Sequence, residues 1–311
     1  MKKNEIEKNH EDHEKQIEGV FNELWVGRGD NYEDDGLMRD TLDRYNAWSD
    51  GKISSYIQDY FDSSDSSSLR IFDAGCGLGF SFNSIFSSYK KRIEYTGVDL
   101  IDLKRTEKFL SARGYSHKLL RASMVDLPPD VPRGHYDIVL ALGTLMCTES
   151  TLKALSSTYS VLKTGGLYIG WIINVQKPVR AVTDKYFRHY FDNKQNPSDA
   201  HDEISALAKF CQNLGQALGD QKVVVSDDVP VLGLPAGEYK IQTLIYDYLI
   251  KLYYVKGHSL DRTYDQLFDW FMPKWYHQTS RTELEEMIKS LNPSRSDIVT
   301  KTNGHLFFIT K

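Results

Sequence analysis

A glycine-rich turn between an apolar strand and a helix constrains this chain more than any other feature of its sequence. Residues 70–81 read RIFDAGCGLGFS, in which an apolar run ends at Asp73 and Gly75, Gly77 and Gly79 lead into the next segment. Glycine lets the backbone turn sharply and lets a ligand lie directly against the main chain. The pattern therefore predicts a strand–loop–helix unit that holds a small molecule against its loop.

Two common nucleotide-binding loops do not fit this turn. A dinucleotide-binding turn needs G-x-G-x-x-G, but counting from Gly75 places Phe80 at the last position, and counting from Gly77 places Phe82 there. A P-loop needs Gly-Lys-Ser/Thr at its end, and no lysine follows the turn before Lys90. The sequence therefore argues against NAD and against nucleoside triphosphates as ligands.

The segment around this turn alternates short apolar runs with helical stretches. Such alternation is typical of a parallel sheet with helices on both faces. The expected strands are 70–74, 92–100, 117–122, 136–142 and 166–173, and the expected helices lie near 81–89, 103–113 and 149–162. The pattern indicates an α/β fold with a doubly wound sheet.

These motifs resemble the class I S-adenosylmethionine-dependent methyltransferases, in particular members that modify small molecules or glycans. Asp73 followed by G-x-G-x-G is similar to the family's first motif, and VLKTGG at 161–166 is similar to the L-K-P-G-G turn before its fifth strand. The resemblance covers residues 70–173. It implies a seven-stranded, mainly parallel sheet, S-adenosylmethionine as cofactor and S-adenosylhomocysteine as product.

The resemblance also assigns the cofactor-binding residues. Asp99, at the end of the second strand, is expected to accept hydrogen bonds from the ribose hydroxyls; the alternative is that Asp99 caps the helix that begins near Asp102. Ser123 stands where the family has the aspartate that accepts from the adenine amino group, so apolar contact with Met124 and Leu100 is expected to carry more of the affinity. The full expected set is Asp73, Ala74, Gly75, Gly77, Gly79, Asp99, Leu100, Ser123, Met124, Leu140 and Ala141.

The rest of the chain is expected to surround this core. Residues 1–61 read as an N-terminal helical cap whose segment 25–32 closes over the cofactor, and 62–69 as a Ser-rich connector. Residues 174–269 interrupt the sheet pattern after strand 5 with two amphipathic helices, at 204–218 and 241–252, and are expected to form a lid. Residues 270–311 supply the last helix and two strands.

The charge and cysteine content of the chain indicate which kinds of partner and which cellular compartment to expect. The chain carries 38 basic and 43 acidic residues, a formal charge of -5, so it lacks the basic footprint of a nucleic-acid binder. Its three cysteines lie far apart, which excludes a CxxC metal pair and favours a reducing cytoplasm. A charged N-terminus and the absence of a long apolar run predict neither export nor membrane anchoring.

Methyl transfer needs mainly a well-positioned acceptor, and a base assists when the acceptor is a hydroxyl or a protonated amine. The candidate base is His277, which follows an aromatic run in a segment, 268–284, that resembles a D-W-x-x-P…H…T-x-E motif of small-molecule and glycan-modifying members. His258 and His189 are weaker candidates, and a structural role is open for all three. His10 and His13 lack a third ligand nearby, so no metal is expected.

These observations predict transfer of a methyl group to an oxygen or nitrogen, with carbon as a further option, of a small-molecule or sugar acceptor. No nucleic acid or membrane partner is expected. The alternative is a catalytically silent methyltransferase-like module that binds S-adenosylmethionine or serves as a partner subunit. The intact glycines and Asp99 argue against it, because a module that no longer bound the cofactor would need neither.

Overall fold

The computed structural model describes residues 2–27, 35–194, 197–218, 220–252 and 254–311. The chain divides into two compact units, one of residues 1–174 and 275–311 and the other of residues 175–274. The expected segment 25–32 of the cap lies only partly within the described residues.

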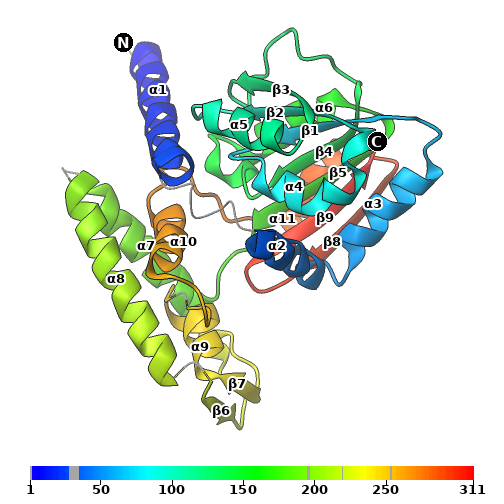
Figure 1. The fold of residues 1–311 in the computed structure, drawn as a ribbon. Coiled ribbons are helices and arrows are strands. Elements are labelled where there is room, and N and C mark those ends of the chain that lie inside the picture. The colour runs from blue at the N-terminus through cyan, green and yellow to red at the C-terminus, as the bar shows by residue number, and fades with distance from the viewer. Residues whose placement is uncertain (1, 28–34, 195–196, 219, 253) are drawn as a thin grey trace. The chain divides into compact units, whose positions relative to one another are not determined.

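The first unit is built on a seven-stranded sheet with the strand order β3-β2-β1-β4-β5-β9-β8 (Figure 1). Strands β1 to β5 are parallel, whereas β9 is antiparallel to both of its neighbours. The strands are β1 Leu69–Ala74, β2 Ile93–Asp99, β3 Ser116–Arg121, β4 Tyr136–Leu142, β5 Leu162–Ile173, β8 Arg295–Thr300 and β9 Gly304–Thr310. The predicted seven-stranded, mainly parallel sheet is confirmed.

Helices cover both faces of this sheet, as the alternating pattern predicts. One face packs against α2 Asp35–Trp48, α3 Lys52–Ser63, α4 Phe80–Phe86 and α5 Lys104–Ala112, and the other against α6 Thr151–Val161 and α11 Arg281–Ser290. Strand side chains alternate between the two cores, so that Leu140 packs on the first face and Ala141 on the second. Short 3-10 turns, η3 Ser87–Arg92 and η4 Leu145–Cys147, follow α4 and β4.

A capping box begins the last helix of the sheet domain. The Ser280 hydroxyl accepts a hydrogen bond from the Glu283 amide, while the Glu283 carboxylate accepts one from the Ser280 amide, which is a complete capping box at the start of α11. The N-terminal helical cap begins with α1 Lys2–Phe21, which a π-helical turn, η1 Asn22–Gly27, follows.

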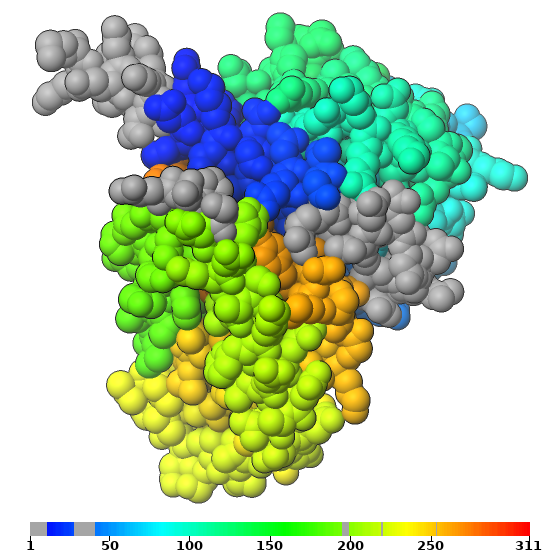
Figure 2. Space-filling view, turned by 60° about the vertical axis from the view of Figure 1, so that its left-hand side comes forward, coloured from blue at the N-terminus to red at the C-terminus, as the bar shows by residue number. Residues whose placement is uncertain are grey.

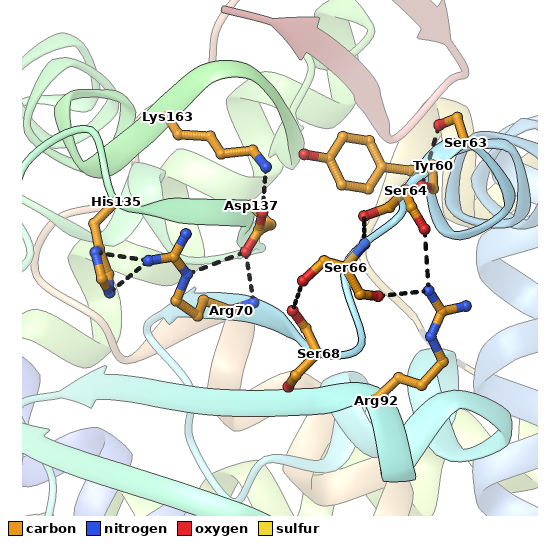
Figure 3. Close-up of polar contacts among 10 residues, drawn as sticks. All are labelled: Tyr60, Ser63, Ser64, Ser66, Ser68, Arg70, Arg92, His135, Asp137 and Lys163. Atoms are coloured by element: carbon orange, nitrogen blue, oxygen red, sulfur yellow. Dashed lines mark hydrogen bonds and ion pairs between the residues drawn. The ribbon is translucent and has the colours of Figure 1, made fainter.

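A buried aspartate ties the strands together at their amino ends (Figure 3). Asp137 of β4 accepts hydrogen bonds from the Arg70 amide at 2.7 Å and from the Lys163 ammonium group. Burial raises the pKa of the Asp137 carboxyl, but the bonds from Lys163 and Arg70 outweigh it, so the net pKa is lowered. In the connector, Arg92 donates to the Ser66 carbonyl at 3.0 Å. Ion pairs of Asp137 thus hold the amino ends of the strands together. The glycine turn lies at the opposite, carboxyl ends.

The second unit is mostly helical. Figure 2 shows the yellow-green surface of α8 and the yellow surface of the paired strands β6 and β7. Its elements are α7 Pro178–Asp192, α8 Pro197–Leu218, β6 Lys222–Val225, η5 Pro230–Leu232, β7 Gly237–Lys240, α9 Ile241–Leu244, η6 Ile245–Leu249 and α10 Leu260–Phe271. The helix predicted over 204–218 lies within α8. The helix predicted over 241–252 is wrong in form: it is one turn of α-helix and a π-turn, and it ends at Leu249 because Ile250 is extended.

A group of charged side chains lies inside the second unit. Arg180 is completely buried, and its Nε donates to Asp184 at 2.7 Å, while the Trp270 indole N–H donates to the other oxygen of Asp184 at 3.0 Å. Lys251 donates to the Tyr246 hydroxyl at 2.7 Å and lies 3.6 Å from the centre of the Trp270 ring. Burial and the charge of Arg180 lower the pKa of Lys251 well below its usual value. None of the helices in the described ranges is both long enough and apolar enough to cross a membrane.

Candidate functional site

The strand order locates a ligand site at one edge of the sheet. The chain runs from β1 outward to β2 and β3, then returns to place β4 on the other side of β1. Between β1 and β4 the loops after the two strands therefore lead away in opposite directions. In open α/β sheets a ligand binds outside the carboxyl ends of the strands at this switch point. The loops after β1, β2 and β4 are thus the candidate site.

The predicted glycine turn occupies this point. The amides of Gly75 and Cys76 both donate to the Val98 carbonyl, at 2.8 and 3.1 Å, which fixes the loop against the end of β2. Gly75 has φ +75°, and a Cβ there would lie 2.4 Å from Thr144 and 3.0 Å from Met124. The loops after β3 and β4 therefore close directly onto Gly75, and only glycine fits.

Gly77 has a different environment. Its φ is +48°, which favours glycine, and the three described atoms nearest to a Cβ there all belong to the Trp25 side chain, at ordinary contact distances from 3.8 Å. The Gly77 amide donates to Asp99 at 2.8 Å and its carbonyl accepts from the Thr106 hydroxyl at 2.7 Å. Hydrogen bonds therefore orient both peptide groups that flank Gly77, while its Cα faces the Trp25 ring.

Asp99 is held at the end of β2 by main-chain donors. One carboxylate oxygen accepts from the Gly77 amide, and the other from the Leu100 amide at 2.7 Å and the Ile101 amide at 3.3 Å. Burial raises the pKa of the Asp99 carboxyl, and these three backbone bonds oppose the shift. Asp99 is not a helix cap: α5 begins at Lys104, and it is Asp102 whose carboxylate accepts from the Lys104 amide. The capping alternative is therefore excluded.

Asp73 lies beneath the turn rather than on its surface. It is almost completely buried and accepts a hydrogen bond of 2.9 Å from the Tyr95 hydroxyl of β2. Burial raises the pKa of Asp73 to about 7, although the Tyr95 bond works against the shift. Ala74 is fully buried, and its carbonyl accepts from the Thr144 hydroxyl at 2.8 Å. Both residues support the loop from below.

The segment after β3 lies beside the glycine turn. Met124 is half-buried and reaches Gly75, and Leu100 is half-buried next to Asp99. The Ser123 hydroxyl accepts from the Val125 amide at 3.4 Å, which leaves it a second lone pair. Met124, Leu100 and Ser123 are therefore available to form an adenine wall. Gly79, the third glycine, packs against Leu110: a Cβ at Gly79 would lie 3.2 Å from the Leu110 side chain. The role of Gly79 is therefore structural.

The two predicted cofactor-binding residues of β4, Leu140 and Ala141, do not reach the end of the sheet where the glycine turn lies. Leu140 and Ala141 are completely buried and pack in the two cores of the sheet. The residues that reach the edge are Gly143 and Thr144, and the sequence reasoning missed both. The available sequence signal was a Gly-Thr pair directly after an apolar strand. Glycine readily adopts a positive φ, here +84° at Gly143, at the point where the chain leaves the sheet.

His277 is oriented by the loop after β4. Its amide donates to the Met146 carbonyl at 2.9 Å, and its Nε2 lies 2.9 Å from the Thr148 carbonyl oxygen. Since a carbonyl only accepts, Nε2 carries the proton, and in the neutral ring Nδ1 is then the basic nitrogen. His258 and His189 belong to the second unit, where His189 lies 3.1 Å from the Asn193 side chain. Among the described residues no cluster of histidine, cysteine and carboxylate side chains could hold a metal ion.

These features fit S-adenosylmethionine. Gly77 adds no side chain to the turn, Asp99 presents a carboxylate that main-chain donors orient, and Leu100 and Met124 supply apolar surface for a base. A cofactor with a nucleoside and no phosphate requires no lysine in the loop. The fold and this donor set suit a nucleoside-binding site at the switch point of the sheet.

Comparison with known proteins agrees. Residues 72–168 match the methyltransferase domain family. This match covers less than half of the chain, and together with the strand order it supports a class I S-adenosylmethionine-dependent methyltransferase domain with S-adenosylmethionine as its cofactor. No curated protein matches the chain.

Solved structures are similar only at the level of the fold. The [4+2]-cyclase SpnF is 18% identical, with a TM-score of 0.33 and coverage of 40% of this chain; this chain spans about half, 49%, of that protein. The 1,6-didemethyltoxoflavin-N1-methyltransferase of Burkholderia thailandensis, solved with S-adenosylhomocysteine, is 10% identical, with a TM-score of 0.43 and coverage of 88% and 87%. An O-methyltransferase family protein of the same organism is 10% identical, with a TM-score of 0.41 and coverage of 90% and 61%. Likeness this remote says nothing about the acceptor.

Proposed function

We propose that the protein transfers the methyl group of S-adenosylmethionine to an oxygen or nitrogen atom of a small-molecule or sugar acceptor, with carbon as a further alternative. The observation that carries the proposal is the joint placement of the glycine turn, Asp99 and Thr144 at the switch point of the sheet. The bound cofactor supplies an activated methyl group, so the protein needs mainly to orient the two reactants and to exclude water.

The chain's own residues have distinct parts in this proposal. Asp99 binds the ribose, the peptide at Gly77 supports the cofactor, and Met124 and Leu100 contact the base. His277 is the proposed proton acceptor for a hydroxyl or protonated amine, because the Thr148 carbonyl holds its N–H and leaves Nδ1 as the basic atom. The insertion of residues 175–274 is the proposed acceptor-binding unit.

A substitution at His277 tests the catalytic part of the proposal. We expect His277→Ala to leave the affinity for S-adenosylhomocysteine unchanged and to lower turnover about 100-fold or more, because general base catalysis typically contributes that much. The measurement is the release of S-adenosylhomocysteine with a panel of hydroxyl and amine acceptors.

His277→Gln is the matched control, since its amide N–H can still donate to the Thr148 carbonyl but the side chain takes up no proton. If the histidine were only structural, the glutamine variant would keep both the melting temperature and the turnover of the wild type, contrary to the proposal. If the wild type binds the cofactor firmly yet turns over no acceptor in the panel, the silent module becomes the better description.

A further inference from the structure

The N-terminal segment is fastened over the loops that carry the cofactor site. The Asn22 side-chain carbonyl accepts from the Asp102 amide at 2.7 Å, and Arg105 donates to the Val26 carbonyl at 2.6 Å. Glu18 forms an ion pair with Arg121 at the end of β3. These three ties connect α1 and η1 to the loop after β2, to the first turn of α5 and to the end of β3. Figure 2 shows the blue N-terminal surface directly against the teal surface of the sheet domain.

The ties bring one large aromatic side chain to the glycine turn. Trp25, in the π-helical turn η1, packs against Leu78 and lies 3.8 Å from the Cβ position of Gly77. Leu24, with 1% of its surface exposed, anchors the turn. A π-helical turn shifts the register of the side chains that follow it and is frequent at functional sites. Here it presents the indole to the main chain of the loop while Leu24 remains buried.

The geometry also couples the indole to Asp99. The Gly77 peptide that Trp25 covers is the one whose amide donates to the Asp99 carboxylate. Trp25 is half-buried, so it keeps exposed apolar surface beside the loop. A ligand held by Asp99 and lying along Gly77 would cover that surface. Aromatic contacts of this kind stabilise a complex beyond the area they bury.

We propose that Trp25 is a cofactor-contacting residue, and that the ties of Glu18, Asn22 and Arg105 keep its indole over the cofactor so that S-adenosylhomocysteine leaves only when the segment lifts. The inference rests on the cofactor site described above. It predicts two separable effects: loss of the indole weakens binding, and loss of the ties speeds exchange.

The test uses the full chain and S-adenosylhomocysteine. We expect Trp25→Ala to weaken the dissociation constant about 3-fold to 10-fold and to raise the dissociation rate by a similar factor. Glu18→Gln combined with Asn22→Ala should raise both the association and dissociation rates, since both need the segment to lift. Glu11→Ala, at an exposed position of the same helix, is the matched control and should behave as wild type.

A spectroscopic measurement identifies the contact directly. The chain has five tryptophans, and S-adenosylhomocysteine should change the indole fluorescence of the wild type but much less that of Trp25→Phe, a variant that keeps the packing against Leu78. Wild-type affinity, rates and fluorescence change in both Trp25 variants would overturn the inference while leaving the cofactor assignment intact. Absence of binding to the wild type would instead overturn the cofactor site and this inference with it.

Discussion

Replacing Asp184 with alanine should destabilise the second unit by about 3 to 5 kcal/mol, the cost of breaking a buried ion pair by removing one partner. The Asp184 carboxylate neutralises Arg180, which has no exposed surface, and also accepts from the Trp270 indole N–H. Its loss would leave a guanidinium charge in the interior without its carboxylate, and Nη2 of Arg180 has no hydrogen-bond partner among the residues that the structure describes. Urea unfolding followed by circular dichroism gives the change in free energy.

Asp192→Ala is the matched control on the same helix. Asp192 pairs with Lys274 at 2.6 Å, but its side chain is 46% exposed, so the expected cost is about 0 to 1 kcal/mol. Equal destabilisation by the two alanine variants would show that burial does not set the energy of the Asp184 pair.

Lys251→Met probes the same cluster through pH. Because burial lowers the folded-state pKa of Lys251, the unfolded chain binds more protons than the folded one between that lowered pKa and the usual value near 10.4. Wild-type stability should therefore rise with pH across this alkaline window. Lys251→Met should remove the rise, and an unchanged slope would mean that Lys251 is not its source.

The sheet domain was predictable because its signals are local. An apolar strand, a glycine turn and a helix follow one another within a dozen residues, so the parallel strands and the turn at Gly75 followed from the sequence alone. The start of α11 also depends on a local signal, since its capping box of Ser280 and Glu283 lies within four consecutive residues. The resemblance of residues 70–173 to the class I methyltransferases then predicted S-adenosylmethionine as the cofactor.

What the sequence did not reveal depends on contacts between distant residues. Thr144 closes on Gly75 across 69 positions, a relation that no periodicity encodes. The π-turns η1 and η6 were missed because apolar residues at helical spacing do not distinguish a helix from a wider turn. Arg180 and Asp184 are four residues apart and look like an exposed surface pair, yet tertiary packing of α7 and η6 buries them.

The acceptor, by contrast, was beyond prediction for a chemical reason. The cofactor is recognised by a few residues that every member must supply, whereas an acceptor pocket is formed by whichever side chains suit one substrate. In this chain such side chains are expected in residues 175–274, where the helices have ordinary amphipathic patterns. An amphipathic pattern encodes which face is buried and not what the exposed face binds.

Replacing Asp99 with alanine should weaken the binding of S-adenosylhomocysteine about 10-fold to 100-fold, since a hydrogen bond to a charged group contributes about 1.5 to 3 kcal/mol. The Asp99 oxygens already accept from the Gly77, Leu100 and Ile101 amides, so the carboxylate is oriented before the ligand arrives. Asp102→Ala, which removes a more exposed carboxylate three residues further on, should leave the affinity unchanged. Titration calorimetry measures all three proteins.

A ribose-modified ligand separates direct contact from disturbance of the loop. If Asp99 accepts from the ribose, the 2′-deoxy analogue of S-adenosylhomocysteine should bind the wild type more weakly than the parent compound, whereas Asp99→Ala should distinguish the two poorly. The interaction energy from this cycle belongs to the carboxylate–hydroxyl pair, because the loop changes equally for both ligands. An equal preference for the parent compound in both proteins would place the ribose elsewhere and leave Asp99 as a support of the Gly77 peptide alone.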